Sequence, residues 1–174
     1  MQDLRSEQPP RAAIQEMVHQ GERAPQFTLV DTDKKPHSLS EFTKANKVTV
    51  LAFFPGAFTG VCTKEMCTFR DSLAELERVP AHVVAISVND PWSNKGFSEH
   101  NRLNFPILSD YNREVIKQFN IIHENFGGLK GYTAAKRSVF VLDSNGVITY
   151  AWVSDDPGKE PVYEDVKRAA AKTA

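Results

Sequence analysis

The sequence predicts an α/β fold in which helices cover both faces of a central mixed β-sheet. Two runs of consecutive apolar residues, 48–54 (VTVLAFF) and 82–88 (HVVAISV), are typical of strands that are buried on both sides. A helical pattern follows each run, so strands and helices alternate along the chain. The chain then continues with a hairpin signal and one further helical segment, which adds antiparallel strands to the predicted sheet.

The first 21 residues are predicted to form an N-terminal helical extension ahead of a single domain, residues 22–174. Within 9–21, four apolar residues recur at helical spacing and Gly21 stops the pattern. The four residues are Ala13, Ile14, Met17 and Val18. This short amphipathic helix either packs on its own domain or forms an arm that reaches a partner subunit.

The next elements lead up to the first buried strand and the helix after it. Alternating residues 27–31 predict a strand, and a turn follows at 33–35. A single helical turn is predicted at 40–42. Pro55 ends the strand 48–54, because proline cannot donate to the β-ladder. The helix 63–77 follows, with Pro80 beyond its end. Its predicted apolar face is made by Met66, Phe69, Leu73 and Leu76.

The second half of the chain continues the alternation of strands and helices. After the buried strand 82–88, the predicted elements are a helix from Asp90 to about Asn101, a strand 105–108 and a helix 113–119. A glycine-rich loop follows at 126–132. The strands 138–143 and 147–153, joined by the turn Ser144-Asn145-Gly146, predict a hairpin. The last predicted helix covers 160–171.

Length and composition exclude several classes of protein. A chain of 174 residues with 41% hydrophobic and 25% charged residues is an ordinary single globular domain. A net charge of −1 and the lack of a basic block argue against nucleic-acid binding. No apolar run is long enough to span a membrane, and the N-terminus lacks the apolar core of a secretory signal. The expected location is therefore cytoplasmic.

Two cysteines are too few for a disulfide framework or for a structural zinc site made by cysteines alone. The five histidines show no close metal-ligand spacing, so a structural or surface role is expected for them. No metal or other cofactor is therefore predicted. In a reducing compartment, the cysteines are expected to be catalytic, redox-active or inert.

The stretch 55–62 (PGAFTGVC) places Cys62 between a buried strand and the start of the next helix. The first turn of a helix has unpaired backbone N–H groups and the positive end of the helix dipole. Both favour a thiolate over a thiol, and the thiolate is the nucleophilic form of cysteine. The stretch therefore predicts an activated cysteine, and the alternative is a buried, inert structural cysteine.

Pro55, Thr59 and Cys62 match the Pro-x-x-x-Thr-x-x-Cys motif of the peroxiredoxins. The match continues through 62–67 (CTKEMC) and 69–71 (FRD), and resembles the bacterioferritin-comigratory protein or peroxiredoxin Q branch of that family. The resemblance covers roughly residues 22–168. It implies a thioredoxin-like fold with an extra N-terminal strand and an inserted helix.

The resemblance also implies a role for each matching residue. Cys62 would be the peroxidatic cysteine, whose thiolate attacks a peroxide oxygen and becomes a sulfenic acid. Thr59 would bind the sulfur or the peroxide through its hydroxyl, a role compatible with capping the helix. Pro55 would shield the cysteine as well as end the strand. Arg137 would stabilise the thiolate, and Glu65 would hold Arg137 in place. From the sequence alone, Arg137 and Glu65 could also be exposed surface charges.

Cys67 matches the position of the resolving cysteine in many peroxiredoxin Q proteins. On an intact helix, the Cα atoms of Cys62 and Cys67 would lie roughly 8.7 Å apart. A disulfide spans no more than about 7 Å between Cα atoms, so this pairing requires the start of the helix to unwind. The alternative is an enzyme that uses one cysteine and an external thiol, with Cys67 simply buried on the helix.

The function implied is that of a thiol-dependent peroxidase acting on hydrogen peroxide and organic hydroperoxides, with a thioredoxin-like reductant. A homodimer is the assembly that we expect. Phe58, Trp92 and the N-terminal helix are the candidate contacts between subunits. A thioredoxin-type oxidoreductase is disfavoured, because four residues rather than two separate the cysteines. A non-enzymatic redox-sensing or holdase module on the same fold is the remaining alternative.

Overall fold

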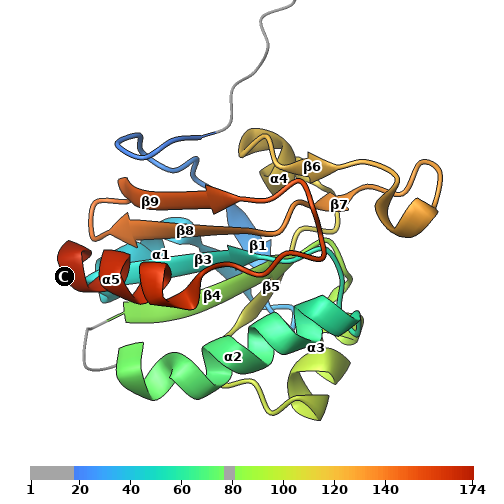
Figure 1. Ribbon diagram of the computed structural model, residues 1–174, viewed down its shortest axis with the longest axis horizontal. Coiled ribbons are helices and arrows are strands. Elements are labelled where there is room, and N and C mark those ends of the chain that lie inside the picture. The colour runs from blue at the N-terminus through green and yellow to red at the C-terminus, as the bar shows by residue number, and fades with distance from the viewer. Residues whose placement is uncertain (1–17, 77–80) are drawn as a thin grey trace, which may run out of the picture.

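A seven-stranded mixed sheet forms the centre of the structure, a computed structural model that describes residues 18–76 and 81–174 (Figure 1). Its strand order is β2-β1-β5-β4-β3-β8-β9. The strands are β1 (Thr28–Val30), β2 (Pro36–Ser38), β3 (Val48–Phe53), β4 (Ala81–Ser87), β5 (Ile107–Ser109), β8 (Ser138–Asp143) and β9 (Ile148–Val153). Strands β3, β4 and β5 are parallel, whereas β1, β8 and β9 pair antiparallel. The predicted α/β class with a central mixed sheet is confirmed.

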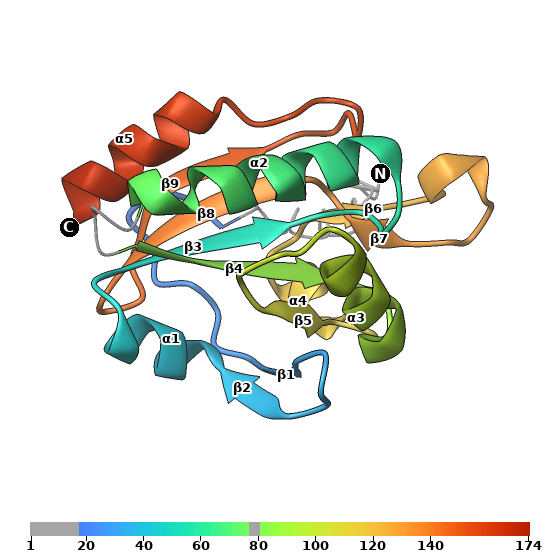
Figure 2. The same cartoon turned by 90° about the horizontal axis from the view of Figure 1, so that it is seen from below.

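Helices cover both faces of this sheet (Figure 2). They are α1 (Leu39–Ala45), α2 (Gly60–Leu76), α3 (Pro91–His100), α4 (Glu114–Gln118) and α5 (Tyr163–Thr173). Because side chains alternate along a strand, Val50 and Ala52 of β3 pack into one core with α2, α3 and α5. Leu51 and Phe53 pack into the other core, which α1 and α4 cover. The six residues of β3 are all buried, as the apolar run predicts.

The antiparallel pairing of β3 with β8 brings two distant segments to one end of the sheet. Phe53, the last residue of β3, lies opposite Ser138, the first residue of β8. Val153, the last residue of β9, lies on the other side of Ser138. The turn after β3, the residue before β8 and the loop after β9 therefore meet at the same sheet end. The motif residues 55–62 occupy this end.

Two helices and one strand begin two or three residues away from their predicted starts. Helix α2 begins at Gly60, three residues before the predicted start. The sequence predicted a later start because glycine is a poor helix former and the apolar pattern begins after Gly60. Helix α5 begins at Tyr163 rather than at residue 160, because Pro161 disfavours helical geometry in the residue before it. Strand β5 begins at Ile107, because Pro106 has no N–H to donate.

Three local features were only partly predicted. Helix α1 has seven residues, where the sequence predicted a single turn at 40–42. The described residues also form a second sheet of two short strands, β6 (Ile122–His123) and β7 (Ala134–Ala135), on either side of a 3₁₀ turn, η1 (Phe126–Gly128). Two residues per strand are too few to give a periodic pattern. The β8–β9 hairpin is confirmed, and its turn ends at Gly146 with φ +79°, a value that favours glycine.

The predicted N-terminal helix within 9–21 lies almost wholly outside the described residues, and the boundary between residues 21 and 22 stays a prediction. The described chain enters beside β9, where the N–H of Gly21 donates to the carbonyl of Ile148 and the N–H of Ile148 donates to the carbonyl of Glu22. Of the residues described, no helix is both long and apolar enough to cross a lipid bilayer.

Candidate active site

Cys62 lies in the first turn of α2, at the sheet end where β3 stops. Its side chain is 0% exposed and belongs to the core that α2 shares with the sheet. The turn that leads to it is fixed by the carboxamide of Asn89, whose Oδ1 accepts from the N–H of Ala57 at 2.9 Å. Phe58 in this turn has φ +63°, a strained value for a residue other than glycine. The reversal thus carries Cys62 back onto the sheet.

Arg137 brings its guanidinium to the sulfur of Cys62 from across the sheet. Its Nη2 donates to Sγ of Cys62 at 3.1 Å. The residue immediately precedes β8, which is antiparallel to β3, and this register places it beside the turn that contains Cys62. Arg137 is 2% exposed, so its interaction with the sulfur is little screened by solvent. Despite burial, the negative charges of Cys62 and Glu65 raise the pKa of Arg137.

The loop after β9 holds the guanidinium in place. Nε and Nη2 of Arg137 donate to the carbonyl oxygen of Pro157 at 3.1 and 2.8 Å. The backbone carbonyl of Arg137 also accepts from the N–H of Ser154 at 3.0 Å. These contacts, with those to Cys62 and Glu65, fix both the position and the plane of the side chain.

Glu65 lies on α2 one turn after Cys62 and binds the other end of the same guanidinium. Nη1 of Arg137 donates to Oε1 of Glu65 at 3.0 Å, and the carboxyl group is 0% exposed. Among the described residues, Oε2 of Glu65 has no hydrogen-bond partner. Burial raises the pKa of Glu65 to about 7, although Arg137 opposes the shift. Glu65 is therefore a buried partner of Arg137 rather than an exposed surface charge.

The raised pKa of Glu65 predicts a change in stability with pH. The folded protein keeps a proton on Glu65 that the unfolded chain releases above about pH 4.5. Binding this proton stabilises the folded state, and the contribution is fully present below pH 4.5. It is lost as the pH rises through about 7. We expect the difference in unfolding free energy between the wild type and Glu65→Gln to fall by up to about 3 kcal/mol from pH 4.5 to pH 8. Urea unfolding of both proteins across this range measures it. A constant difference would contradict the raised pKa.

Thr59 and Pro55 lie in the same turn as Cys62. The hydroxyl of Thr59 donates to the carbonyl oxygen of Gly56 at 2.7 Å, and the carbonyl of Thr59 accepts the N–H of Thr63 at 2.9 Å. The Thr59 side chain therefore closes the turn, and its role toward the sulfur or a peroxide stays a prediction. Pro55 is buried two residues after the end of β3 at Phe53, and its role in shielding the cysteine stays a prediction.

Cys67 lies on the same helix as Cys62 and contacts α3. Both cysteines are free thiols, and α2 is continuous through the two positions. Cys67 is partly buried, and its Sγ donates to Oδ1 of Asn101 at 3.7 Å. The geometry is that of the reduced state, so the pairing of Cys62 with Cys67 stays a prediction that requires unwinding.

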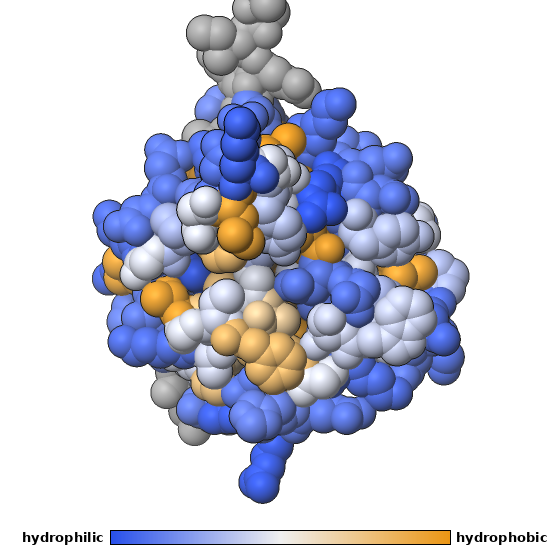
Figure 3. Space-filling view, turned by 90° about the vertical axis from the view of Figure 1, so that its right-hand side faces the viewer, coloured by the Kyte–Doolittle hydropathy of each residue, from blue (hydrophilic) through white to orange (hydrophobic). Residues whose placement is uncertain are grey.

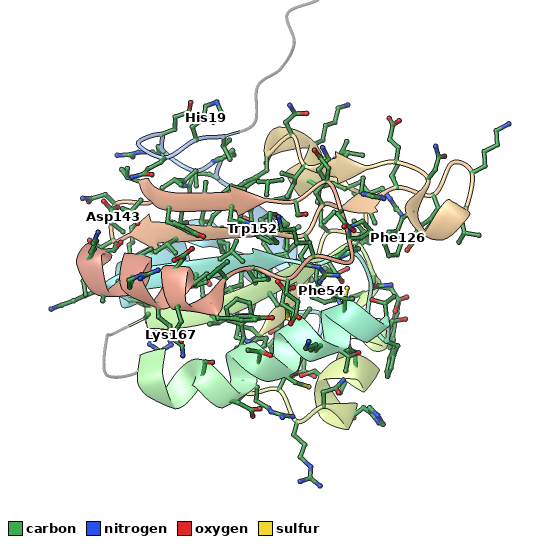
Figure 4. The ribbon with its side chains drawn as sticks, in the orientation of Figure 1. His19, Phe54, Phe126, Asp143, Trp152 and Lys167 are labelled. Carbon is green, nitrogen blue, oxygen red and sulfur yellow. The ribbon has the colours of Figure 1, made fainter. Side chains whose placement is uncertain are left out.

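The sequence did not indicate two further residues at this end of the molecule. Pro157 supplies a backbone carbonyl, which no side-chain pattern reveals. Phe126, in η1, lies over the turn: a Cβ added to Gly56 would meet Cγ2 of Thr59 at 3.5 Å and Cε1 of Phe126 at 3.6 Å. Phe54 and Phe126 both lie near the end of the molecule where α2 begins (Figure 4).

The surface at this end is mostly hydrophilic, with apolar side chains gathered near the centre of the face (Figure 3). Phe58 is 58% exposed, and its ring packs edge-on against the buried Phe97 at 5.4 Å between centroids. Within residues 18–76 and 81–174, no group of three or more potential ligand side chains could hold a metal ion. What the described side chains place together at this end is a cysteine sulfur and a guanidinium.

Comparisons with known proteins show which family this chain is similar to. The sequence model of the AhpC/TSA family matches residues 20–151. Peroxiredoxin Q, chloroplastic, from Populus jackii is 37% identical over 150 residues, which cover 86% of this chain and 67% of that protein. Peroxiredoxin Q, chloroplastic, from Gentiana triflora is 34% identical over 157 residues, which cover 90% of this chain and 69% of that protein.

Solved structures give the same result for the fold. Peroxidoxin BcpB from Mycobacterium tuberculosis superposes with a TM-score of 0.75 at 30% identity, covering 88% of this chain and 96% of that one. Peroxiredoxin Q from Xanthomonas campestris superposes with a TM-score of 0.69 at 24% identity, covering 84% of this chain and 89% of that one. The thioredoxin-like fold of the peroxiredoxins is thereby confirmed for this chain.

Proposed function

This chain belongs to the AhpC/TSA family, which includes peroxiredoxin Q, and from this membership we propose how its residues reduce a hydroperoxide. The protein is a thiol-dependent peroxidase, an oxidoreductase. The main support for Cys62 as the reactive cysteine and Arg137 as its partner is the 3.1 Å contact between Nη2 of Arg137 and Sγ of Cys62. A guanidinium at this distance stabilises a thiolate by charge and by hydrogen bonding.

In the first step, the thiolate of Cys62 attacks the terminal oxygen of a hydroperoxide. An S–O bond forms and the O–O bond breaks, so that the sulfur is oxidised to a sulfenic acid. The leaving alkoxide, or hydroxide in the case of hydrogen peroxide, takes a proton and departs as an alcohol or water. Arg137 keeps the sulfur ionised before attack, and the buried site keeps competing water away.

In the second step, Cys67 resolves the sulfenic acid. The sulfur of Cys67 attacks the sulfur of Cys62, an S–S bond forms and the S–O bond breaks. The departing hydroxide leaves as water with the proton from the Cys67 thiol. A thioredoxin-like dithiol then reduces the disulfide by thiol–disulfide exchange and restores both thiols. Resolution by Cys67 and the thioredoxin-like donor are the parts of this scheme that we propose.

A peroxide-consumption assay with a dithiol reductant tests the activity directly. Hydrogen peroxide and an organic hydroperoxide should both be consumed catalytically, and omission of the reductant should limit the reaction to about one equivalent per protein. Negligible turnover of either peroxide, with Cys62 still oxidised, would favour the alternative of a non-enzymatic redox-sensing or holdase module.

We expect one equivalent of peroxide to produce an intramolecular disulfide between Cys62 and Cys67. Oxidation removes the negative charge that the helix N-terminus and Arg137 stabilise, so the first turns of α2 have less to hold them. Mass spectrometry after rapid quenching identifies the linked peptides. In Cys67→Ser, the same treatment should leave Cys62 as a sulfenic acid that over-oxidises more readily.

The control for this prediction is the wild type without an external reductant. If it accumulates a stable sulfenic acid at Cys62 while Cys67 remains a free thiol, Cys67 is not the resolving cysteine. The enzyme would then depend on an external thiol for resolution, and Cys67→Ser would match the wild type in turnover.

The homodimer also stays a prediction, and exposed aromatic side chains support it. Trp92 is 68% exposed and lines a cavity of about 470 Å³ together with Val30, Lys34, Asp90, Pro91 and Tyr111. Phe58 is a second exposed aromatic ring among the described residues. The cytoplasmic location is likewise a prediction, since the term "chloroplastic" describes the plant relatives.

A further inference from the structure

The thiol of Cys67 is held by the end of α3, in a position away from Cys62. Its Sγ lies 3.7 Å from Oδ1 of Asn101, the C-cap residue of α3. This distance is within the range of a hydrogen bond to sulfur, and the thiol is the donor because the amide oxygen can only accept. Asn101 is thus the polar partner of the predicted resolving cysteine.

Asn101 is itself fixed on three sides, so its contact with Cys67 is not a chance approach of two mobile groups. Its Nδ2 donates to the carbonyl of Phe97 at 3.0 Å, and its backbone N–H donates to the same oxygen at 3.2 Å. The carbonyl of Asn101 accepts from Nη1 of Arg70 at 2.5 Å. Because Nδ2 is occupied by Phe97, Oδ1 is turned toward α2 and Cys67.

This arrangement fixes where the Cys67 side chain points. Its thiol donates to Oδ1 of Asn101, and this hydrogen bond must break before the sulfur can move toward Cys62. Disulfide formation requires the two sulfurs to meet, so the contact opposes the reaction as long as α2 is intact. Arg70, one turn after Cys67 on α2, also binds Asn101 and so links α2 to the end of α3.

We propose that Asn101 is a positioning residue that holds the Cys67 side chain against α3 by this hydrogen bond and so delays its attack on oxidised Cys62. This proposal rests on the proposed resolution by Cys67. The delay leaves the sulfenic acid exposed to a second peroxide, which would add an oxygen to the sulfur by breaking another O–O bond and give a sulfinic acid. Asn101 thereby sets the balance between disulfide formation and over-oxidation.

Two substitutions at Asn101 separate the hydrogen bond to sulfur from the stability of the helix end. Asn101→Ala removes the acceptor, whereas Asn101→Asp replaces it with a charged acceptor, which forms a stronger hydrogen bond with the thiol. Both variants lose the bond from Nδ2 to Phe97, so any effect of that loss is common to them. Glu99→Gln, an exposed change on the same turn of α3, is the matched control.

Rapid-quench mass spectrometry measures the rate of the Cys62–Cys67 disulfide and the fraction of sulfinic acid at increasing peroxide. We expect Asn101→Ala to form the disulfide about two- to fivefold faster and to over-oxidise less, as loss of one weak hydrogen bond implies. Asn101→Asp should form it more slowly and over-oxidise more. Glu99→Gln should match the wild type. Equal rates in all proteins, or shifts of both Asn101 variants in one direction, would overturn the proposal.

A second measurement does not depend on resolution by Cys67. In a Cys62→Ser background, iodoacetamide alkylates Cys67 alone, and its rate reports the reactivity of that thiol. Asn101→Ala should raise this rate and Asn101→Asp should lower it. If the wild type forms no Cys62–Cys67 disulfide yet these rates shift as expected, the proposed resolution fails but the effect of Asn101 on Cys67 stands. Unchanged alkylation rates would overturn that effect as well.

Discussion

Replacing Cys62 with serine is expected to abolish peroxide reduction while leaving the fold intact. A serine hydroxyl is not ionised at neutral pH, so the guanidinium of Arg137 would have no anion to stabilise. The site would then lack a strong nucleophile. Serine is close in volume to cysteine, so the core around α2 should be conserved. We expect turnover to fall by more than about 10³-fold, as for other enzymes that lose their nucleophile. Steady-state peroxide consumption measures it.

The matched control is Cys67→Ser, the same chemical change five residues along the same helix. With an external monothiol present, Cys67→Ser should retain turnover, because Cys62 can still be oxidised and then reduced directly. Circular dichroism should show both variants folded. Substantial turnover by Cys62→Ser would rule out Cys62 as the nucleophile and leave the contact with Arg137 without a catalytic explanation.

Arg137→Ala is expected to reduce both activity and stability. The sulfur of Cys62 loses its charged donor, and we expect its oxidation to slow by about 10²-fold, the effect of about 3 kcal/mol. Above about pH 7, where Glu65 is ionised, it also loses its ion-pair partner in a fully buried position, which typically costs about 3–5 kcal/mol. Stopped-flow fluorescence during peroxide addition gives the oxidation rate, and urea unfolding gives the stability.

The double variant Arg137→Ala/Glu65→Gln separates these two effects. It leaves no unpaired buried carboxylate, so it should recover part of the lost stability while the oxidation of Cys62 stays slow. Arg137→Lys keeps the charge but lacks the forked donors that reach Cys62, Glu65 and Pro157 together, and intermediate activity is expected. If the pH profile of Cys62 alkylation were the same in Arg137→Ala and the wild type, Arg137 would have no part in ionising the sulfur.

The sequence predicted the structure best where an element depends on residues that are close together in the chain. The run 48–54 predicted a buried strand because consecutive apolar residues suit a strand covered on both faces, and the turn residues within 138–153 predicted a hairpin. The predictions were least accurate at the ends of elements. Pro106 shifted the start of β5 by its missing donor, and Pro161 shifted the start of α5 by restricting the residue before it. A hydrophobic pattern describes neither effect.

The active-site residues were likewise predictable only where a local pattern determines them. The placement of Cys62 at a helix start follows from the local pattern, whereas the resemblance to peroxiredoxins was needed to single out Arg137. The contact between them depends on the register of β8 against β3, which hydrophobic patterns do not specify. The carbonyl of Pro157 and the ring of Phe126 depend on how loops fold over that sheet end. The residue types in those loops do not predict either contact.

The long sequence separation between Cys62 and Arg137 has a consequence for the protein during its synthesis. The two residues are 75 positions apart, and Pro157 lies a further 20 positions along the chain. A nascent chain that has exposed the motif 55–62 outside the ribosome still lacks the guanidinium, the strand that positions it and the carbonyl that orients it. Until the last strands emerge, Cys62 is an ordinary cysteine. The order of residues thus postpones the reactive sulfur until the newly made domain can enclose it.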